Sequence, residues 1–214
     1  NLTMFRVMLF LLLMAPCSGQ ADEKYDLVII NGKIVNGTGN PWFYADVAIR
    51  GDRIAAIGKL DHVAAERTID AKGLGVAPGF IDMHSHSDFL LLEDGNAQSK
   101  IRQGVTTEVL GEGNSAGPYQ GKLSPRRTQI GDKIVELSTL GDYFDAIERA
   151  GISTNICSYV GINNVWRSVM GSTFDRPTAE QIKQMQKLVD GAMRDGAMGL
   201  SSQVMMPPGS LATT

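Results

Sequence analysis

The 214-residue sequence contains few residues of several informative kinds. It has two cysteines and three histidines, and aromatic residues make up 7% of the chain. Two cysteines cannot build the disulfide framework of a small secreted domain. The net charge is −3 and the pI is about 5.6, so the basic surface expected of a nucleic-acid-binding protein is missing. We therefore predict no nucleic-acid partner, and nothing in the sequence indicates an oligomeric state.

The sequence also lacks an apolar run of about 18 residues, the length that a transmembrane helix needs. Residues 7–14 are all apolar, follow a short start that contains Arg6, and are broken by Pro16. Small residues at Gly19 and Ala21 then suit a cleavage site, which completes the order of a secretory signal peptide. We predict a signal peptide over 1–21, cleavage near Ala21, export to the periplasm or medium, and no stable membrane insertion. A retained membrane anchor is the alternative.

One of the two cysteines, Cys17, lies in this signal, so only Cys157 remains in the mature chain. It cannot form an internal disulfide. Because it follows Ile156 in an apolar strand pattern, we predict a buried structural thiol rather than a catalytic one.

Residues 22–78 consist of short β-branched runs that end at glycine or asparagine, such as DLVIING, KIVNG, ADVAIRG and RIAAIG. Asn31-Gly32, Asn36-Gly37 and Gly51-Asp52 are turn signals between them. This stretch predicts a small N-terminal β-sandwich or β-roll domain.

From Gly79 onward, apolar strand patterns alternate with amphipathic helix patterns. We predict strands over 80–84, 105–110, 153–160 and 197–201, and helices over 96–103, 139–150 and 178–194, the last opened by a capping box of Thr178 and Gln181. Such alternation favours parallel βα units. An α/β fold follows, in which 79–214 forms about four strands of a (β/α)8 TIM barrel. Since a whole barrel takes about 250 residues, we expect a truncated barrel. A genuine four-stranded α/β domain is the alternative.

His84 and His86 are the most informative residues, because they directly follow the apolar segment Phe80-Ile81-Asp82-Met83 and a Pro-Gly turn. Residues two apart on a strand point to the same face, and the carboxyl ends of barrel strands carry active sites. Two imidazoles placed together suit a divalent ion such as Zn²⁺. The sequence therefore predicts a metal site, in which bound water becomes a nucleophile.

The segment APGFIDMHSHSD, which contains these histidines, resembles the PGxIDxHxH motif of the amidohydrolase superfamily. The segments GVTTEVLGEGNSAGP and DGAMGLSSQVMMPPG resemble its D-aminoacylase (N-acyl-D-amino-acid deacylase) branch, and the likeness covers 25–214. In that branch a cysteine in GVTTVVVGNCG bridges to the metal. This chain has no cysteine there, and Glu112 is the residue best able to replace it.

Four further residues are expected near the metal, because Asp82 and Asp88 flank the histidines and Ser201 and Ser202 end the fourth predicted strand. Asp82 is expected to orient an imidazole through a hydrogen bond, with a purely structural role as the alternative. Asp88, Ser201 and Ser202 are expected to line the pocket or to support it. The family's later histidines and its general acid/base aspartate are expected beyond Thr214, so the 214 residues alone should be inactive.

For the intact protein the resemblance implies hydrolysis of the amide C–N bond of an N-acyl-D-amino acid or related amide by a metal-bound hydroxide, with one or two Zn²⁺ ions. One alternative is a cyclic amidase of the dihydroorotase or hydantoinase type, which would carry a carbamylated lysine that AMGLSSQ does not offer. The other is an exported protein of the same fold that binds a ligand without turnover.

Overall fold

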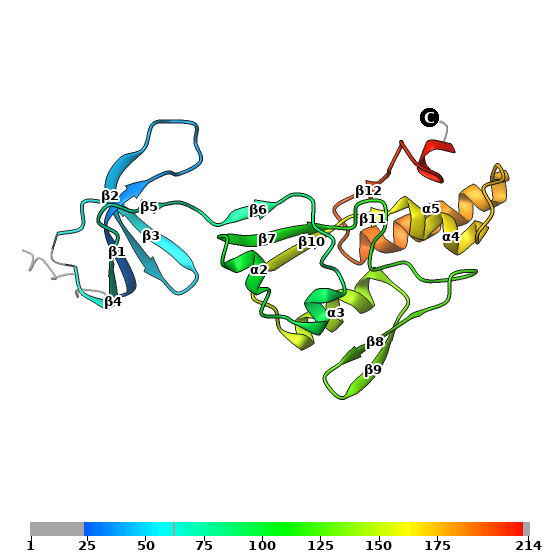
Figure 1. Ribbon diagram of the computed structural model, residues 1–214, viewed down its shortest axis with the longest axis horizontal. Coiled ribbons are helices and arrows are strands. Elements are labelled where there is room, and N and C mark those ends of the chain that lie inside the picture. Colours follow the sequence, from blue (N-terminus) through cyan, green and yellow to red (C-terminus); the bar gives the residue numbers. More distant parts are fainter. Residues whose placement is uncertain (1–23, 62, 212–214) are drawn as a thin grey trace, which may run out of the picture. The chain divides into compact units, whose positions relative to one another are not determined.

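The computed structural model describes residues 24–61 and 63–211 of the chain (Figure 1). The predicted signal peptide over 1–21 lies outside these ranges. The chain divides into two compact units, of which the first ends at Pro78 and the second begins at Gly79. Among the described residues, no helix has both the length and the apolar character that crossing a membrane requires.

The first unit contains one mixed sheet of five strands. Its strands are β1 (Tyr25–Ile34), β2 (Phe43–Arg50), β3 (Arg53–Gly58), β4 (Ala65–Asp70) and β5 (Gly75–Val76). Strand β1 pairs antiparallel with β2 and parallel with both β4 and β5, while β3 pairs with the outer edge of β2. The predicted turn at Gly51-Asp52 joins β2 to β3, since Arg50 pairs with Arg53 across it.

The predicted turn at Asn31-Gly32 is wrong. Asn31 does have the positive φ of a turn residue, 60°, but the chain continues in the same direction as strand β1. The pairing with β2 shifts between Ile29 and Gly32, which is the signature of a β-bulge. A bulge uses the same backbone conformation as a tight turn, so the residue pair alone could not separate the two.

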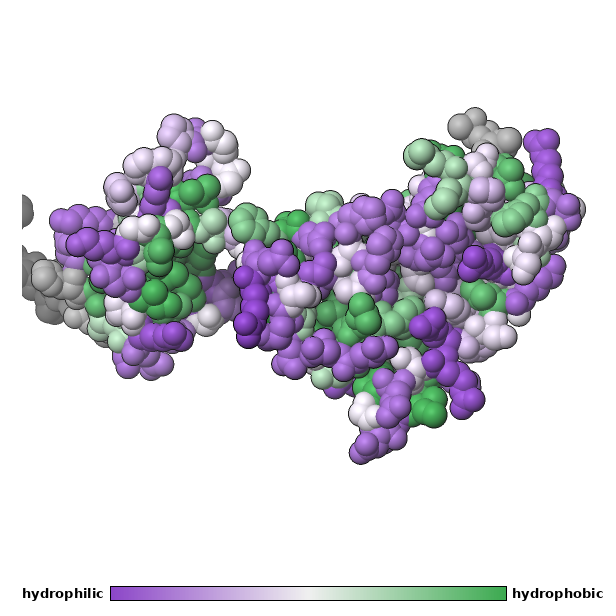
Figure 2. Space-filling model, in the orientation of Figure 1, coloured by the Kyte–Doolittle hydropathy of each residue, from purple (hydrophilic) through white to green (hydrophobic). Residues whose placement is uncertain are grey.

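The sheet of the first unit leaves much apolar surface uncovered (Figure 2). Ile54 on β3 is 63% exposed, and Ile57 on the same strand is 48% exposed. An apolar cavity of about 160 Å³ lies within the unit, lined by these two residues and by Ile29, Ile34 and Val47 among others. A sandwich needs a second sheet, and the described residues up to Pro78 form this single one.

The second unit is built on parallel strands that are neighbours in chain order. These are β6 (Phe80–Asp82), β7 (Val105–Leu110), β10 (Asn155–Ser158), β11 (Val160–Gly161) and β12 (Leu200–Ser201). Strand β7 lies between β6 and β10, and β11 pairs with β12. Because only Tyr159 separates β10 from β11, the order of the pairings runs from β6 through β7 and β10/β11 to β12, as expected of βα units.

Helices and one hairpin connect these strands (Figure 1). The helices are α1 (Leu90–Glu93), α2 (Gln98–Ile101), α3 (Leu140–Ala150), α4 (Ile162–Met170) and α5 (Ala179–Arg194), and the 3-10 helix η1 covers Gly209–Leu211. Strands β8 (Arg126–Ile130) and β9 (Lys133–Leu137) form the antiparallel hairpin between β7 and α3. Neither this hairpin nor α4 was predicted.

The two long predicted helices are confirmed, including the way that they begin. Thr178 caps α5 and forms the predicted capping box with Gln181, and Thr139 does the same for α3 with Asp142. The predicted apolar stripe of α5 is only partly buried, because Ile182 remains 45% exposed.

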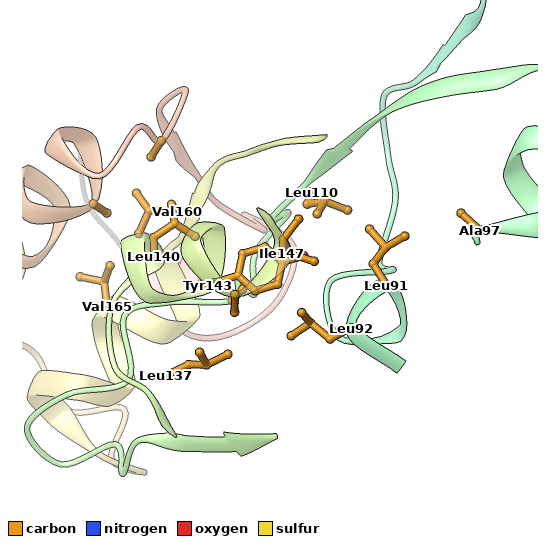
Figure 3. Packing of buried hydrophobic residues seen from close by; sticks show 14 residues of the cluster. Leu91, Leu92, Ala97, Leu110, Leu137, Leu140, Tyr143, Ile147, Val160 and Val165 are labelled. Atoms are coloured by element: carbon orange, nitrogen blue, oxygen red, sulfur yellow. The ribbon is translucent and has the colours of Figure 1, made fainter. Parts of the chain in front are cut away.

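One hydrophobic cluster holds the second unit together (Figure 3). Helix α3 contributes Leu140, Tyr143 and Ile147, which pack near Leu110 from the end of β7 and Val160 from β11. Tyr143 and Leu110 are 0% and 1% exposed. The cluster therefore fixes the carboxyl ends of β7 and β10/β11, of which the end of β7 carries part of the candidate site.

Candidate metal centre

The two histidines lie on the loop that follows β6, and not on the strand itself. Strand β6 ends at Asp82, so the predicted strand over 80–84 is too long by two residues. The loop still runs beside β7, because the Ser85 backbone N–H donates to the Val109 carbonyl at 3.0 Å. This hydrogen bond places the segment that contains His84 and His86 beside β7.

Glu112 lies on the corresponding loop after β7, between two glycines with positive φ. Gly111 has φ 84° and Gly113 has φ 66°, and residues other than glycine rarely adopt such a backbone conformation. Ser201, at the end of β12, braces this turn: its hydroxyl donates to the Gly111 carbonyl at 2.5 Å and accepts from the Gly113 N–H at 2.9 Å. The polar contacts of Ser201 thus hold the backbone on either side of Glu112.

The three side chains converge on one point. The Nε2 atoms of His84 and His86 lie 3.0 Å apart, and Glu112 Oε2 is in close contact with the first and 3.9 Å from the second. One ligand atom from each residue lies within 4.8 Å of the others. Both imidazoles are more than half exposed, so the group lies at the surface of the described part of the unit.

The chemistry of these atoms fits a divalent metal ion. Glu112 Oε2 is buried without a hydrogen-bond partner, although it faces two imidazole nitrogens. A buried carboxylate oxygen without a donor costs free energy unless a cation offsets it. Two nitrogens on one tetrahedral zinc ion lie roughly 3.3 Å apart, given zinc–nitrogen bonds of about 2.0–2.1 Å. The observed separation of 3.0 Å is close to this value.

Asp82 contacts the backbone of the histidine loop instead of an imidazole. Its Oδ1 accepts from the His84 backbone N–H at 3.2 Å, and its Oδ2 accepts from Lys100 Nζ at 2.5 Å. The bond from Lys100, followed by that from His84, lowers the pKa of the Asp82 carboxyl. The Asp82 bond in turn raises the pKa of Lys100, so the pair is ionised at neutral pH.

Glu108, which sequence reasoning missed, is the most buried polar group near the histidine loop. It is 0% exposed and accepts hydrogen bonds from Ser85 Oγ at 2.6 Å, Ser87 Oγ at 2.5 Å and Thr154 Oγ1 at 3.0 Å. Burial raises the pKa of Glu108, but the three hydroxyls and the nearby Lys100 charge together lower it below its ordinary value. A charged residue inside the otherwise uncharged strand VTTEVL was the signal that could have identified it.

The remaining predicted residues lie at different depths. Asp88 is buried, and its Oδ1 has no hydrogen-bond partner; burial raises the pKa of its carboxyl. Ser202 is exposed and follows β12 directly. Cys157 is half-buried in β10, and burial raises the pKa of its thiol, so the group is not activated as a nucleophile.

Parallel βα units with two histidines and a carboxylate at their carboxyl ends define an α/β protein with a candidate divalent-metal centre. The amidohydrolase family model matches residues 67–206. The chain belongs to the amidohydrolase family.

Three similar proteins fall within one branch of that family. The D-aminoacylase of Alcaligenes xylosoxydans xylosoxydans is 38% identical over 199 residues, which cover 91% of this chain and 41% of that protein. The structure of the N-acyl-D-glutamate deacylase from Bordetella bronchiseptica, solved with zinc and a phosphonate mimic of the tetrahedral intermediate, is 35% identical with a TM-score of 0.79. That match covers 89% of this chain and 41% of the solved one.

A solved D-aminoacylase, described as having a binuclear metal centre with one-metal activation and second-metal attenuation, is 36% identical with a TM-score of 0.79. It is covered to 40%, and this chain to 88%. The chain therefore spans about two fifths of the length of the relatives that it matches. These matches confirm the resemblance to D-aminoacylases and the amidohydrolase fold.

Proposed function

We propose that the full-length protein is a metal-dependent hydrolase that cleaves the amide C–N bond of N-acyl-D-amino acids. The observation that carries the proposal is the convergence of His84, His86 and Glu112 at the carboxyl ends of β6 and β7. The similarity to D-aminoacylase and to N-acyl-D-glutamate deacylase supports the substrate class. The partner is then a small N-acyl amino acid.

Zinc is the proposed ion, and the imidazoles of His84 and His86 would hold it, with Glu112 as the third ligand. A bound zinc ion would supply Lewis acidity and lower the pKa of a bound water to about 7. Glu112 faces the imidazoles with Oε2, and the same carboxylate would also hold a second ion if one binds. The number of ions bound, one or two, therefore depends on the other residues that surround Glu112.

Proton transfer is proposed to use a carboxylate other than the two beside the histidine loop, Asp82 and Glu108. Within the described part of the chain, Asp82 is paired with Lys100, and Glu108 accepts three hydroxyl bonds. A general base needs a free lone pair near the reacting atom, and these two carboxylates are otherwise engaged. An aspartate from a later strand, as the family resemblance implies, would supply this group.

The remaining fold proposals concern how the two units are completed. We propose that β6, β7, β10/β11 and β12 are the first half of a (β/α)8 barrel, because they are parallel and paired in chain order. We also propose that a second sheet covers the apolar face formed by Ile54, Ile57 and their neighbours, which makes a β-sandwich.

Export remains a proposal that rests on the N-terminal sequence. The apolar run 7–14 and the small residues Gly19 and Ala21 support cleavage near Ala21. N-terminal sequencing of the protein from the extracellular fraction should begin at about residue 22, whereas a cytoplasmic protein with an intact N-terminus would contradict export.

Hydrolysis of N-acyl-D-amino acids by the full-length protein tests the function. We expect release of the free D-amino acid, loss of this activity in a chelator, and its recovery with zinc. His84→Ala should abolish it, while Asp132→Ala, at an exposed position in the turn of the β8–β9 hairpin, serves as the control and should retain it. Chelator-insensitive hydrolysis, or preference for a cyclic amide, would contradict the proposal.

A further inference from the structure

The two serines between and after the histidines point away from the metal site and into the protein. In the run His84-Ser85-His86-Ser87, both imidazoles reach Glu112, whereas both hydroxyls donate to a single oxygen, Oε2 of Glu108. Alternate residues of an extended segment point to opposite sides. One side of this loop therefore carries the metal ligands, and the other side is hydrogen-bonded to a buried carboxylate.

Glu108 has a fixed position from which to hold the loop. It lies on β7, where it pairs with Asp82 of β6, and it is fully buried. Its other oxygen, Oε1, accepts from Thr154, which directly precedes β10. The carboxylate thus joins the histidine loop to two neighbouring strands of the sheet.

Lys100 completes the electrostatic environment of this carboxylate. Its Nζ lies 3.5 Å from Glu108 Oε2 and donates to Ser85 Oγ at 3.1 Å. A buried carboxylate with a cation and several donors remains ionised and binds its donors strongly. Ser85 accepts from Lys100 and donates to Glu108, so its hydroxyl has one defined orientation.

We propose that Glu108 is a positioning residue for the metal centre, which acts through Ser85 and Ser87 to keep the imidazoles of His84 and His86 turned toward Glu112. The inference rests on the proposed metal site. Without these two bonds the loop after β6 would keep its backbone hydrogen bond to Val109. It would lose the contacts with Glu108 that keep the serine side of the loop turned inward and the histidine side turned toward Glu112. Partners that orient metal ligands from behind typically change metal affinity by about 10–100-fold when they are removed.

The chain offers a matched control for this role. Ser85→Ala and Ser87→Ala each remove a hydroxyl that links the histidine loop to Glu108, and Thr154→Val removes a hydroxyl that binds the same carboxylate from β10. Ser87→Ala and Thr154→Val each lose one hydrogen bond to Glu108, whereas Ser85→Ala also loses the bond that Ser85 accepts from Lys100. Only the serine variants loosen the loop that carries His84 and His86.

Zinc dissociation constants of the full-length protein and these variants, from competition with a chromophoric chelator, test the proposal. The urea denaturation of each metal-free protein is measured beside them. We expect about tenfold weaker zinc binding for each serine variant, and a change of less than about twofold for Thr154→Val. Ser87→Ala and Thr154→Val should lose similar amounts of stability, so this pair is the matched comparison. Equal zinc affinities in all three variants would overturn the positioning role.

Two further substitutions separate the hydrogen bonds from the charge. Glu108→Gln keeps an acceptor for Ser85 and Ser87, and we expect it to retain zinc affinity better than Glu108→Leu by at least about tenfold. Equal losses in both would overturn the proposed mechanism. If the wild-type protein itself binds no zinc, the metal centre of the proposed function is wrong, which is a different result from a zinc site that is insensitive to Ser85 and Ser87.

Discussion

Replacing Gly111 by alanine should destabilise the protein through a specific steric conflict. An added Cβ would overlap the Tyr159 carbonyl oxygen and would lie 2.7 Å from Ser158 Oγ, and the backbone there has φ 84°. The left-handed conformation costs an alanine about 1–2 kcal/mol, and a forced overlap with a neighbouring strand end costs about 1–3 kcal/mol more. We expect a total loss of about 2–5 kcal/mol.

Gly131→Ala separates the two contributions. Gly131 also has a positive φ, 57°, but an added Cβ would meet no atom within 4 Å. Its loss should therefore be only the conformational cost of about 1–2 kcal/mol. Urea denaturation of both variants of the full-length protein measures the difference, and a loss for Gly111→Ala no larger than that for Gly131→Ala would refute the reasoning.

Three further substitutions test the contacts that hold helix α3 in place. Thr139→Ala and Asp142→Ala each remove half of the capping box, and each should cost about 1 kcal/mol at pH 7 in urea denaturation. Burial raises the pKa of the Asp142 carboxyl, but the hydrogen bonds from the Ser138 and Thr139 backbone N–H groups outweigh this effect and lower the pKa below its ordinary value. A lowered pKa means that this stabilisation is present above about pH 4 and disappears as the pH falls through the folded-state pKa. The difference in the free energy of unfolding between the wild type and Asp142→Ala should therefore shrink at low pH. A constant difference from pH 7 to pH 3 would contradict this. Tyr143→Phe leaves the Asp88 carbonyl without the donor that lies 2.8 Å away, and should cost about 1 kcal/mol by the same measurement; an unchanged free energy of unfolding would show that the bond contributes nothing.

The long helices were predictable because their signals are local. Capping residues and an apolar stripe lie within a few positions of each other, so α3 and α5 follow from the sequence alone. Helix α4 lacks only part of this signal, because it begins at Gly161 without a side-chain cap. Its apolar residues do follow the helical spacing, so this signal was overlooked: Ile162, Val165, Trp166, Val169 and Met170.

The hairpin β8–β9 had a signal that was overlooked. Gly131 and Asp132 form a two-residue connection between two β-branched runs, which is a recognised hairpin pattern. The position of β-bulges and strand ends is harder to predict, because these depend on pairing with other strands. Both the continuation of β1 through Asn31 and the end of β6 at Asp82 are of this kind.

The residues of the candidate metal site could be predicted from the sequence, but their geometry could not. The His-x-His spacing and the absence of a cysteine in the next strand-end loop indicated His84, His86 and Glu112, which the structure brings together. Glu108 and its hydroxyl partners depend on contacts 21 to 46 positions apart in the chain. Such contacts become visible only once the strands are placed side by side.

Zinc K-edge X-ray absorption of the zinc-loaded full-length protein tests the central claim most directly. The account predicts nitrogen and oxygen neighbours at about 2.0–2.2 Å, including the multiple-scattering pattern of imidazole, and a change in this shell in Glu112→Ala. A sulfur neighbour at about 2.3 Å, or a spectrum that His84→Ala and Glu112→Ala leave unchanged, would contradict the assignment of these residues as the metal ligands.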